Sequence, residues 1–175
     1  MKGNLFVDES KSGAYLLVVA CALPAQLGPS RHRMKQFLMP GQRRLHFNSE
    51  RDSRRHQIID GILELNVRST IYQAPPRVNE LDGRQTCIER LGQDAITQTA
   101  ELIVFERDDS LVRHDRRTLH RVLLGPDGQP MVRYQHLRPY EESLLWIPDA
   151  IAWCWAKGGT WRILVQPAVE ELVRL

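Results

Sequence analysis

Two apolar segments near the start of the chain constrain its fold most strongly. Residues 4–8 (NLFVD) contain the continuous apolar run LFV, residues 15–23 (YLLVVACAL) are apolar throughout, and only a short polar turn containing Gly13 separates the two segments. A strand with one solvated face alternates apolar and polar residues. Two runs without alternation therefore predict strands covered on both faces, as in the middle of an α/β sheet. The short turn predicts that they pair as an antiparallel hairpin.

Helical and extended patterns alternate along the rest of the chain. We expect helices over 24–39, 50–65, 78–97, 111–124 and 148–157, strands over 66–73, 101–105 and 131–137, an extended segment over 43–50, and a strand with a short terminal helix in 160–175. Asn48 or Ser49 is expected to cap the second helix, and Leu81 to begin the apolar stripe of the third, which continues through Ile88, Leu91 and Ala95. Strands separated by helices pair in parallel, so we predict one α/β domain over residues 1–175 with a mixed central sheet flanked by helices.

Acidic residues follow the apolar segments at three separate places. The first strand ends in Asp8 and Glu9, a middle strand ends in Glu106, and Asp149 opens a late helix after the segment LLWIP. Asp108 and Asp109 lie just beyond Glu106, and the sequence leaves open which of these three acids faces a site. Functional groups gather at strand ends in α/β sheets, so the acids are expected to meet.

Clustered carboxylates repel one another unless a cation binds between them. Oxygen ligands of this kind suit Mg²⁺ or Mn²⁺, and two such ions can activate a water and stabilise the leaving oxygen in phosphodiester cleavage. Each acid taken alone also fits a solvated strand end or a helix cap, and Asp8 or Glu9 also fits an ion pair with an arginine of the neighbouring strand or helix. For Asp149 the favourable field at a helix N-terminus is a sufficient explanation.

Basic residues flank the acidic positions. The net charge is only +3, but 20 of the 24 basic residues are arginine, which suits phosphate contacts and is also favoured by GC-rich codon usage. The stretch 31–56 is rich in arginine and histidine, and a second basic stretch follows Asp109. We expect Arg43, Arg44, Arg54 and Arg55 to contact phosphate, while solvated helix faces are the alternative. The four Trp residues fit core packing, base stacking or an interface.

Other classes of protein are disfavoured. Cys21, Cys87 and Cys154 form no CxxC pair, His114 and His120 lack the HExxH spacing of zinc hydrolases, and no GxSxG elbow is present. No signal peptide is recognisable, and the longest apolar run is too short to span a bilayer. The sequence predicts a cytoplasmic protein without a membrane partner, and leaves a homodimer open.

Four segments resemble a known family. LFVDES, RRLHFNSE, LIVFERDD and LWIPDAIAW occur in the order found in a bacterial family of unknown function within the ribonuclease H-like superfamily. The resemblance implies a ribonuclease H-like fold in which Asp8, Glu106 and Asp149 bind divalent metal. Glu9 and His46 match recurring positions of the narrower family and are second candidates for catalysis. The strand over 66–73 departs from many nucleases of this superfamily, because it ends without an acid.

The sequence therefore predicts a nuclease dependent on Mg²⁺ or Mn²⁺ that hydrolyses phosphodiester bonds of DNA or RNA. The alternative is a non-catalytic ribonuclease H-like module that binds nucleic acid or a protein partner.

Overall fold

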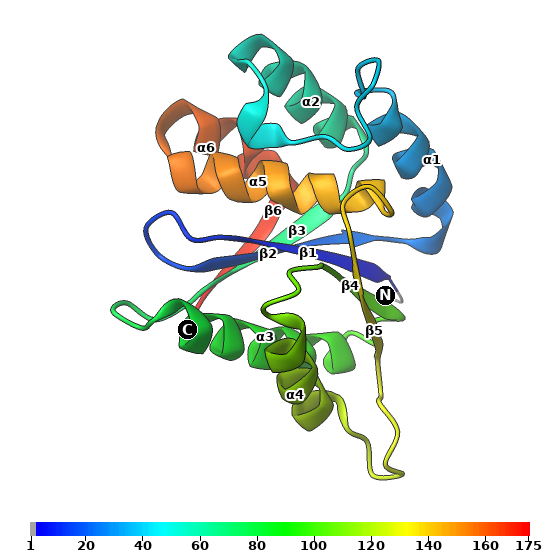
Figure 1. Ribbon diagram of the computed structural model, residues 1–175, viewed down its shortest axis with the longest axis vertical. Helices are drawn as coiled ribbons and strands as arrows, with labels where there is room; N and C mark the ends of the chain where they lie inside the picture. The colour runs from blue at the N-terminus through cyan, green and yellow to red at the C-terminus, as the bar shows by residue number, and fades with distance from the viewer. Residues whose placement is uncertain (1–2) are drawn as a thin grey trace.

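A six-stranded mixed sheet forms the centre of the protein, with helices on both faces (Figure 1). The computed structural model describes residues 3–175. The strand order is β5-β4-β1-β2-β3-β6. The strands are β1 (Asn4–Ser10), β2 (Leu16–Ala22), β3 (Arg68–Gln73), β4 (Leu102–Glu106), β5 (Arg133–Leu137) and β6 (Val169–Arg174), and the helices are α1 (Pro24–Lys35), α2 (Asp52–Glu64), α3 (Glu80–Thr97), α4 (Val112–Leu123), α5 (Trp146–Lys157) and α6 (Gly159–Val165).

The expected opening hairpin is present at the middle of the sheet. β1 and β2 pair antiparallel, and β4 pairs parallel to β1 on its other side. β5 adds in parallel to β4, and β6 adds in parallel to β3. The sheet is mixed, as predicted: within residues 3–175 the only short connection between paired strands is the antiparallel β1–β2 turn, and helices lie between the strands of each parallel pair.

Alternation along β1 sends side chains into two separate cores. Phe6 packs into the core beneath α5, together with residues of α1 and α2, whereas Leu5 and Val7 pack into the core beneath α3 and α4. Figure 1 shows the same division, with α1, α2, α5 and α6 on one side of the sheet and α3 and α4 on the other. Both faces of the hairpin are therefore covered, which explains its continuous apolar sequence.

Several expected details are wrong. The segment 43–50 is a loop that closes in a 3-10 turn at Phe47–Ser49, and the side chain of Asn48 does not cap α2 but accepts a hydrogen bond from the Trp153 indole at 2.9 Å. The residue before α2 is Arg51, without a side-chain cap. Leu81 is 45% exposed, so the buried stripe of α3 begins further along the helix.

The order of the last two elements is also reversed relative to the expectation. A helix, α6, comes first, and the chain ends in β6, which pairs with the edge of β3. That strand depends on a partner about a hundred residues earlier, which local sequence does not reveal. Among residues 3–175, no helix is both long and apolar enough to cross a membrane.

Candidate active site

Asp8 and Glu106 lie on neighbouring parallel strands at the same end of the sheet. The register between β1 and β4 pairs Phe6 with Val104 and Val7 with Phe105, so the next position brings Asp8 level with Glu106. Phe6 and Val104 both belong to the core beneath α5. Since side chains alternate in a strand, Asp8 and Glu106 are directed to that same face, two residues further on.

Asp149 reaches this place from above, in the first turn of α5. The apolar residues of this helix, among them Ala150 and Ile151, are buried against β1 and β2 and fix its position. The Asp149 Oδ2 atom accepts a long hydrogen bond from the backbone N–H of Phe47 at 3.4 Å. His46 precedes Phe47 and is exposed to solvent. The loop that carries His46 therefore meets the first turn of α5, which carries Asp149, beside the strand ends.

The pKa values of all three carboxylates are raised by their surroundings. Burial raises the pKa of Asp8 well above its usual value, and the charges of Glu106, Asp149 and Glu9 raise it further. Burial and the charge of Asp149 raise the pKa of Glu106 to about 7, against an opposing effect of Arg44. The pKa of Asp149 is also raised by burial, although the Phe47 N–H, His46 and Arg44 oppose the rise. Like charges held together in this way favour a bound cation.

Three carboxylates suit a hard divalent cation, but the side chains do not stand in positions from which all three could coordinate one ion. Among residues 3–175, no three His, Cys, Asp or Glu side chains converge closely enough to hold a metal ion as they stand. Glu106 instead faces Arg44, whose Nη1 atom lies 3.9 Å from Oε1. Carboxylate oxygens are the ligands that Mg²⁺ and Mn²⁺ prefer, so the three side chains suit such an ion by their chemistry.

Glu9 is directed away from this group, to the opposite face of the sheet. Its Oε2 atom accepts a hydrogen bond from Arg84 of α3, and Lys11 lies 3.6 Å from Oε1. Arg84 is 2% exposed and also forms a bidentate pair with the buried Asp115 of α4, at 2.7 and 2.8 Å. His136 Nε2 lies 3.0 Å from Asp115 Oδ2. The pairing of Glu9 with an arginine of a neighbouring helix was one of the alternatives that the sequence left open, but the partners Arg84, Asp115 and His136 were not identified from the sequence.

The structure distinguishes among the three acids near the end of β4. Asp108 accepts hydrogen bonds from the backbone N–H and hydroxyl of Ser110. Asp109 pairs with Arg107 and Arg138 at the surface. Glu106 alone of the three is directed toward Asp8 and Asp149, and its pKa responds to the charge of Asp149.

The four arginines expected to contact phosphate occupy different environments. Arg44 is exposed beside Glu106, and Arg43 lies over the Tyr140 ring with its guanidinium carbon 4.7 Å from the centroid. Arg54 pairs with Glu50 and donates to the Phe37 carbonyl.

Arg55 donates to the carbonyls of Phe47 and Asn48 and stacks on Trp153 at 4.3 Å. Arg54 and Arg55 thus hold the loop before α2, whereas Arg44 keeps an exposed guanidinium group beside Glu106 and Arg43 is exposed over the Tyr140 ring.

An open cavity of about 490 Å³ lies next to the carboxylates, between the β1–β2 turn and α5. Its lining includes the three carboxylates Asp8, Glu9 and Asp149 together with Asn48, Trp153, Lys11 and Lys157. The last four were not among the residues expected at the site. Lys11 and Lys157 each stand alone in sequence, outside the arginine-rich stretches, so no local pattern marked them.

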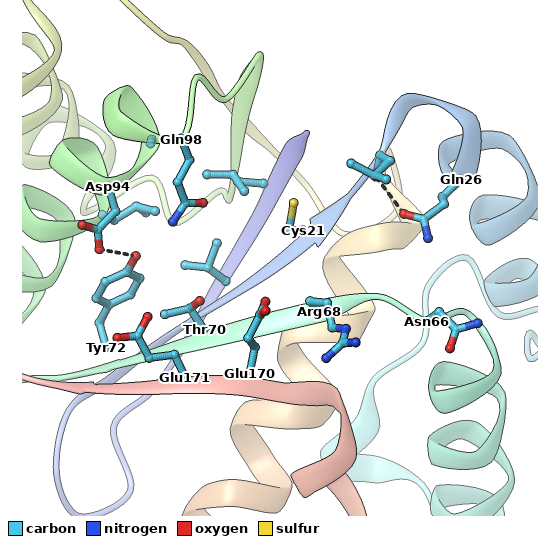
Figure 2. A pocket seen from close by; sticks show the side chains of 15 residues that line it. Cys21, Gln26, Asn66, Arg68, Thr70, Tyr72, Asp94, Gln98, Glu170 and Glu171 are labelled. Atoms are coloured by element: carbon cyan, nitrogen blue, oxygen red, sulfur yellow. Dashed lines mark hydrogen bonds between the residues drawn. The ribbon is translucent and has the colours of Figure 1, made fainter. Parts of the chain in front are cut away.

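A larger cavity of about 630 Å³ opens elsewhere, on the sheet face toward α3 (Figure 2). Its apolar floor includes Leu5 and Val19, and its rim includes Asp94, Glu170, Glu171 and Arg68. None of Asp8, Glu106 and Asp149 lines it. The larger of the two cavities is therefore not the one that adjoins the candidate metal ligands.

Comparisons with solved structures identify the fold. The chain superposes on the structure of the PCNA:RNase HII complex from Archaeoglobus fulgidus with a TM-score of 0.56 and 14% identity, covering 89% of this chain and 73% of that one. It superposes on Bst-RNase HIII in complex with Mn²⁺ with a TM-score of 0.55 and 12% identity, covering 86% of this chain and half, 50%, of the other. No protein-family model and no curated protein matches the chain.

The protein therefore has a ribonuclease H-like fold, as the sequence predicted. The strand ends that carry Asp8 and Glu106 lie side by side in this fold, with the first turn of α5 beside them.

Proposed function

We propose that this protein is a divalent-metal-dependent nuclease that hydrolyses phosphodiester bonds through Asp8, Glu106 and Asp149. The observation that carries the proposal is the meeting of three carboxylates from β1, β4 and α5 at one place, where burial raises the pKa of each, the charges of Glu106 and Asp149 raise that of Asp8 further, and the charge of Asp149 raises that of Glu106. Such an arrangement is unfavourable in an empty protein and favourable around a cation. The ribonuclease H-like fold supports it, as does the Mn²⁺ in the structure of Bst-RNase HIII.

Mg²⁺ or Mn²⁺ held by these oxygens would supply an activated water and charge stabilisation at the leaving oxygen. The contribution of the chain is to place the carboxylates and to hold the substrate. Arg44, 3.9 Å from Glu106, is released from that contact when Glu106 turns to a cation, and can then meet a phosphate. His46, beside Asp149, is placed to contact a phosphate or orient a water. Glu9 belongs to the buried network with Arg84 in this proposal, and does not bind metal.

A second function is favoured by one observation. Because no three potential ligands in residues 3–175 stand within metal-binding reach, the fold also suits a non-catalytic module that holds nucleic acid or a protein partner. Such a module would need Arg43 and Arg44 but not the three carboxylates. We further propose that the protein belongs to the bacterial family that its four sequence segments resemble, and that it is cytoplasmic.

Calorimetry with MgCl₂ and MnCl₂ separates the two functions. The nuclease proposal predicts binding by the wild type and its loss in Asp8→Asn combined with Asp149→Asn. Asp108→Asn is the matched control, because Asp108 lies two residues from Glu106 but bonds to Ser110. Equal titrations for all variants would favour the non-catalytic module.

A further inference from the structure

The cavity beside Asp8 and Asp149 is also lined by side chains that a metal site does not require. We name it the hairpin cavity, after the β1–β2 turn that forms one wall. Lys11 comes from that turn, Asn48 from the 3-10 turn before α2, and Trp153 and Lys157 from α5. Two cations, an indole and an amide thus come from three separate segments to one cavity.

The two lysines are able to take a phosphate. Lys157 is exposed at the end of α5 and lies 6.0 Å from the Trp153 ring centroid. Among residues 3–175 no carboxylate lies within ion-pair distance of Lys157, so its charge is not neutralised there. Lys11 makes two long ion pairs, 3.6 Å to Glu9 and 3.7 Å to Glu80, with 40% of its side chain exposed. Pairs of this length and exposure are weak and give way readily to a phosphate.

Trp153 provides an apolar wall that is held rigidly. Its indole N–H donates to Asn48 Oδ1 at 2.9 Å, Arg55 stacks on it at 4.3 Å, and Phe47 and Trp161 each pack edgewise at 5.4 Å. The ring still lines the cavity. Because the oxygen of the Asn48 amide is occupied by the indole, its nitrogen can donate to the edge of a base. An aromatic wall beside cations is the usual construction of a site for unpaired nucleotides.

We propose that the hairpin cavity holds one unpaired nucleotide of a single-stranded nucleic acid, with its phosphate between Lys11 and Lys157 and its base against Trp153. The inference rests on the proposed function, because the cavity adjoins the carboxylates of the nuclease site. A base inside a duplex is stacked on both faces and presents only its edges, so it must leave the stack to meet the indole. The site therefore selects single-stranded DNA or RNA over a duplex.

Fluorescence anisotropy in EDTA tests this proposal without cleavage. Short labelled single strands of DNA and RNA and a matching duplex are titrated with wild type, with Trp153→Ala and with Lys11→Ala combined with Lys157→Ala. Trp155→Ala and Lys35→Ala are the controls. Trp155 is on the same helix but contacts Arg162 rather than the cavity, and Lys35 is exposed on α1.

We expect the wild type to bind single strands more tightly than the duplex. Trp153→Ala should weaken binding about 5- to 150-fold, the range for loss of one stacked base. The double lysine variant should weaken binding and reduce the slope of log affinity against log salt by about 0.7 for each lost phosphate contact. Both controls should bind like the wild type. Trp153→Phe replaces Trp153→Ala if the latter fails to fold. It keeps an aromatic wall with less disturbance of the core, and should retain most of the affinity for single strands.

Wild-type affinity in both the Trp153 and lysine variants would overturn the proposal, as would tighter binding of the duplex or no binding of single strands. The same samples are then given MnCl₂. Binding that follows the expected pattern without cleavage would refute the nuclease and leave the nucleotide site standing. Cleavage that is unaffected by all these substitutions would refute the site and leave the nuclease standing.

Discussion

The buried pair of Arg84 and Asp115 provides the sharpest test of how the structure is held together. Two hydrogen bonds of 2.7 and 2.8 Å join the guanidinium to the carboxylate, and the side chains are 2% and 1% exposed. Removal of one partner from a buried ion pair leaves a charge without compensation and costs about 3–5 kcal/mol. Glu9 still faces Arg84 after Asp115→Leu, so we expect the lower end of that range, about 3 kcal/mol. This corresponds to a fall in Tm of about 6–12 °C in a chain of this size.

Urea unfolding in EDTA near pH 7 measures the loss, with the midpoint and slope fitted together. The double variant Arg84→Met with Asp115→Leu should be more stable than Asp115→Leu alone, because two apolar side chains replace the pair. Arg90→Met is the matched control on the same helix. Arg90 pairs with Asp94 at 3.0 Å but is 40% exposed, so its loss should cost less than about 1 kcal/mol.

Two results would refute this reasoning. One is a cost below about 1 kcal/mol for Asp115→Leu, the value of an exposed pair. The other is a double variant whose loss equals the sum of the two single losses, which would show that the buried charges are not coupled.

Three further predictions concern the carboxylates and the helix packing. The pKa of Glu106 in the folded protein is raised to about 7, so the metal-free protein should lose stability as the pH rises from about 4.5 to 7. Glu106→Gln should therefore stabilise the protein by about 1–3 kcal/mol at pH 8 but not at pH 4. Thermal melts in EDTA measure this difference. MnCl₂ at a hundredfold excess over Kd should raise the free energy of unfolding of the wild type by about 2.7 kcal/mol, and its Tm with it, but should leave Asp149→Asn unchanged. Gly92→Ala should destabilise the protein by about 1–3 kcal/mol in urea unfolding, because the added Cβ would clash with Val122 of α4. Gly28→Ala is the control and should cost nothing of this kind, because open space surrounds Gly28. No dependence of the Glu106→Gln effect on pH, an equal Mn²⁺ response in Asp149→Asn, or a harmless Gly92→Ala would contradict these in turn.

The sequence predicted the centre of the fold well because local patterns determine it. The apolar runs of β1 and β2 are continuous because both faces are buried, and the polar turn between them leaves little room for anything but a hairpin. The acids were also found correctly as strand-end and helix-start residues. Choosing among Glu106, Asp108 and Asp109 needed the register between β1 and β4, which depends on pairing between segments about a hundred residues apart.

Pairings over long distances explain what the sequence did not reveal. Arg84 appeared to be one more charged residue of an amphipathic helix, yet its partners Glu9 and Asp115 lie 75 and 31 residues away. Glu9 follows Asp8 directly in the chain. Their surroundings differ because successive side chains of a strand point to opposite faces of the sheet, and both faces are covered here. Arg54 and Arg55 are predicted to contact phosphate, and the structure adds that both donate to backbone carbonyls of the loop before α2, which the sequence did not reveal.

Cleavage of labelled single-stranded DNA and RNA in MnCl₂ tests the central claim most directly, with wild type, Asp8→Asn, Asp149→Asn and the control Asp108→Asn assayed side by side. The account predicts cleavage by the wild type and by Asp108→Asn, its loss in the other two variants, and its loss in EDTA. Cleavage that survives both Asp8→Asn and Asp149→Asn, or a folded wild type that binds single strands and never cleaves them with Mg²⁺ or Mn²⁺, would contradict it.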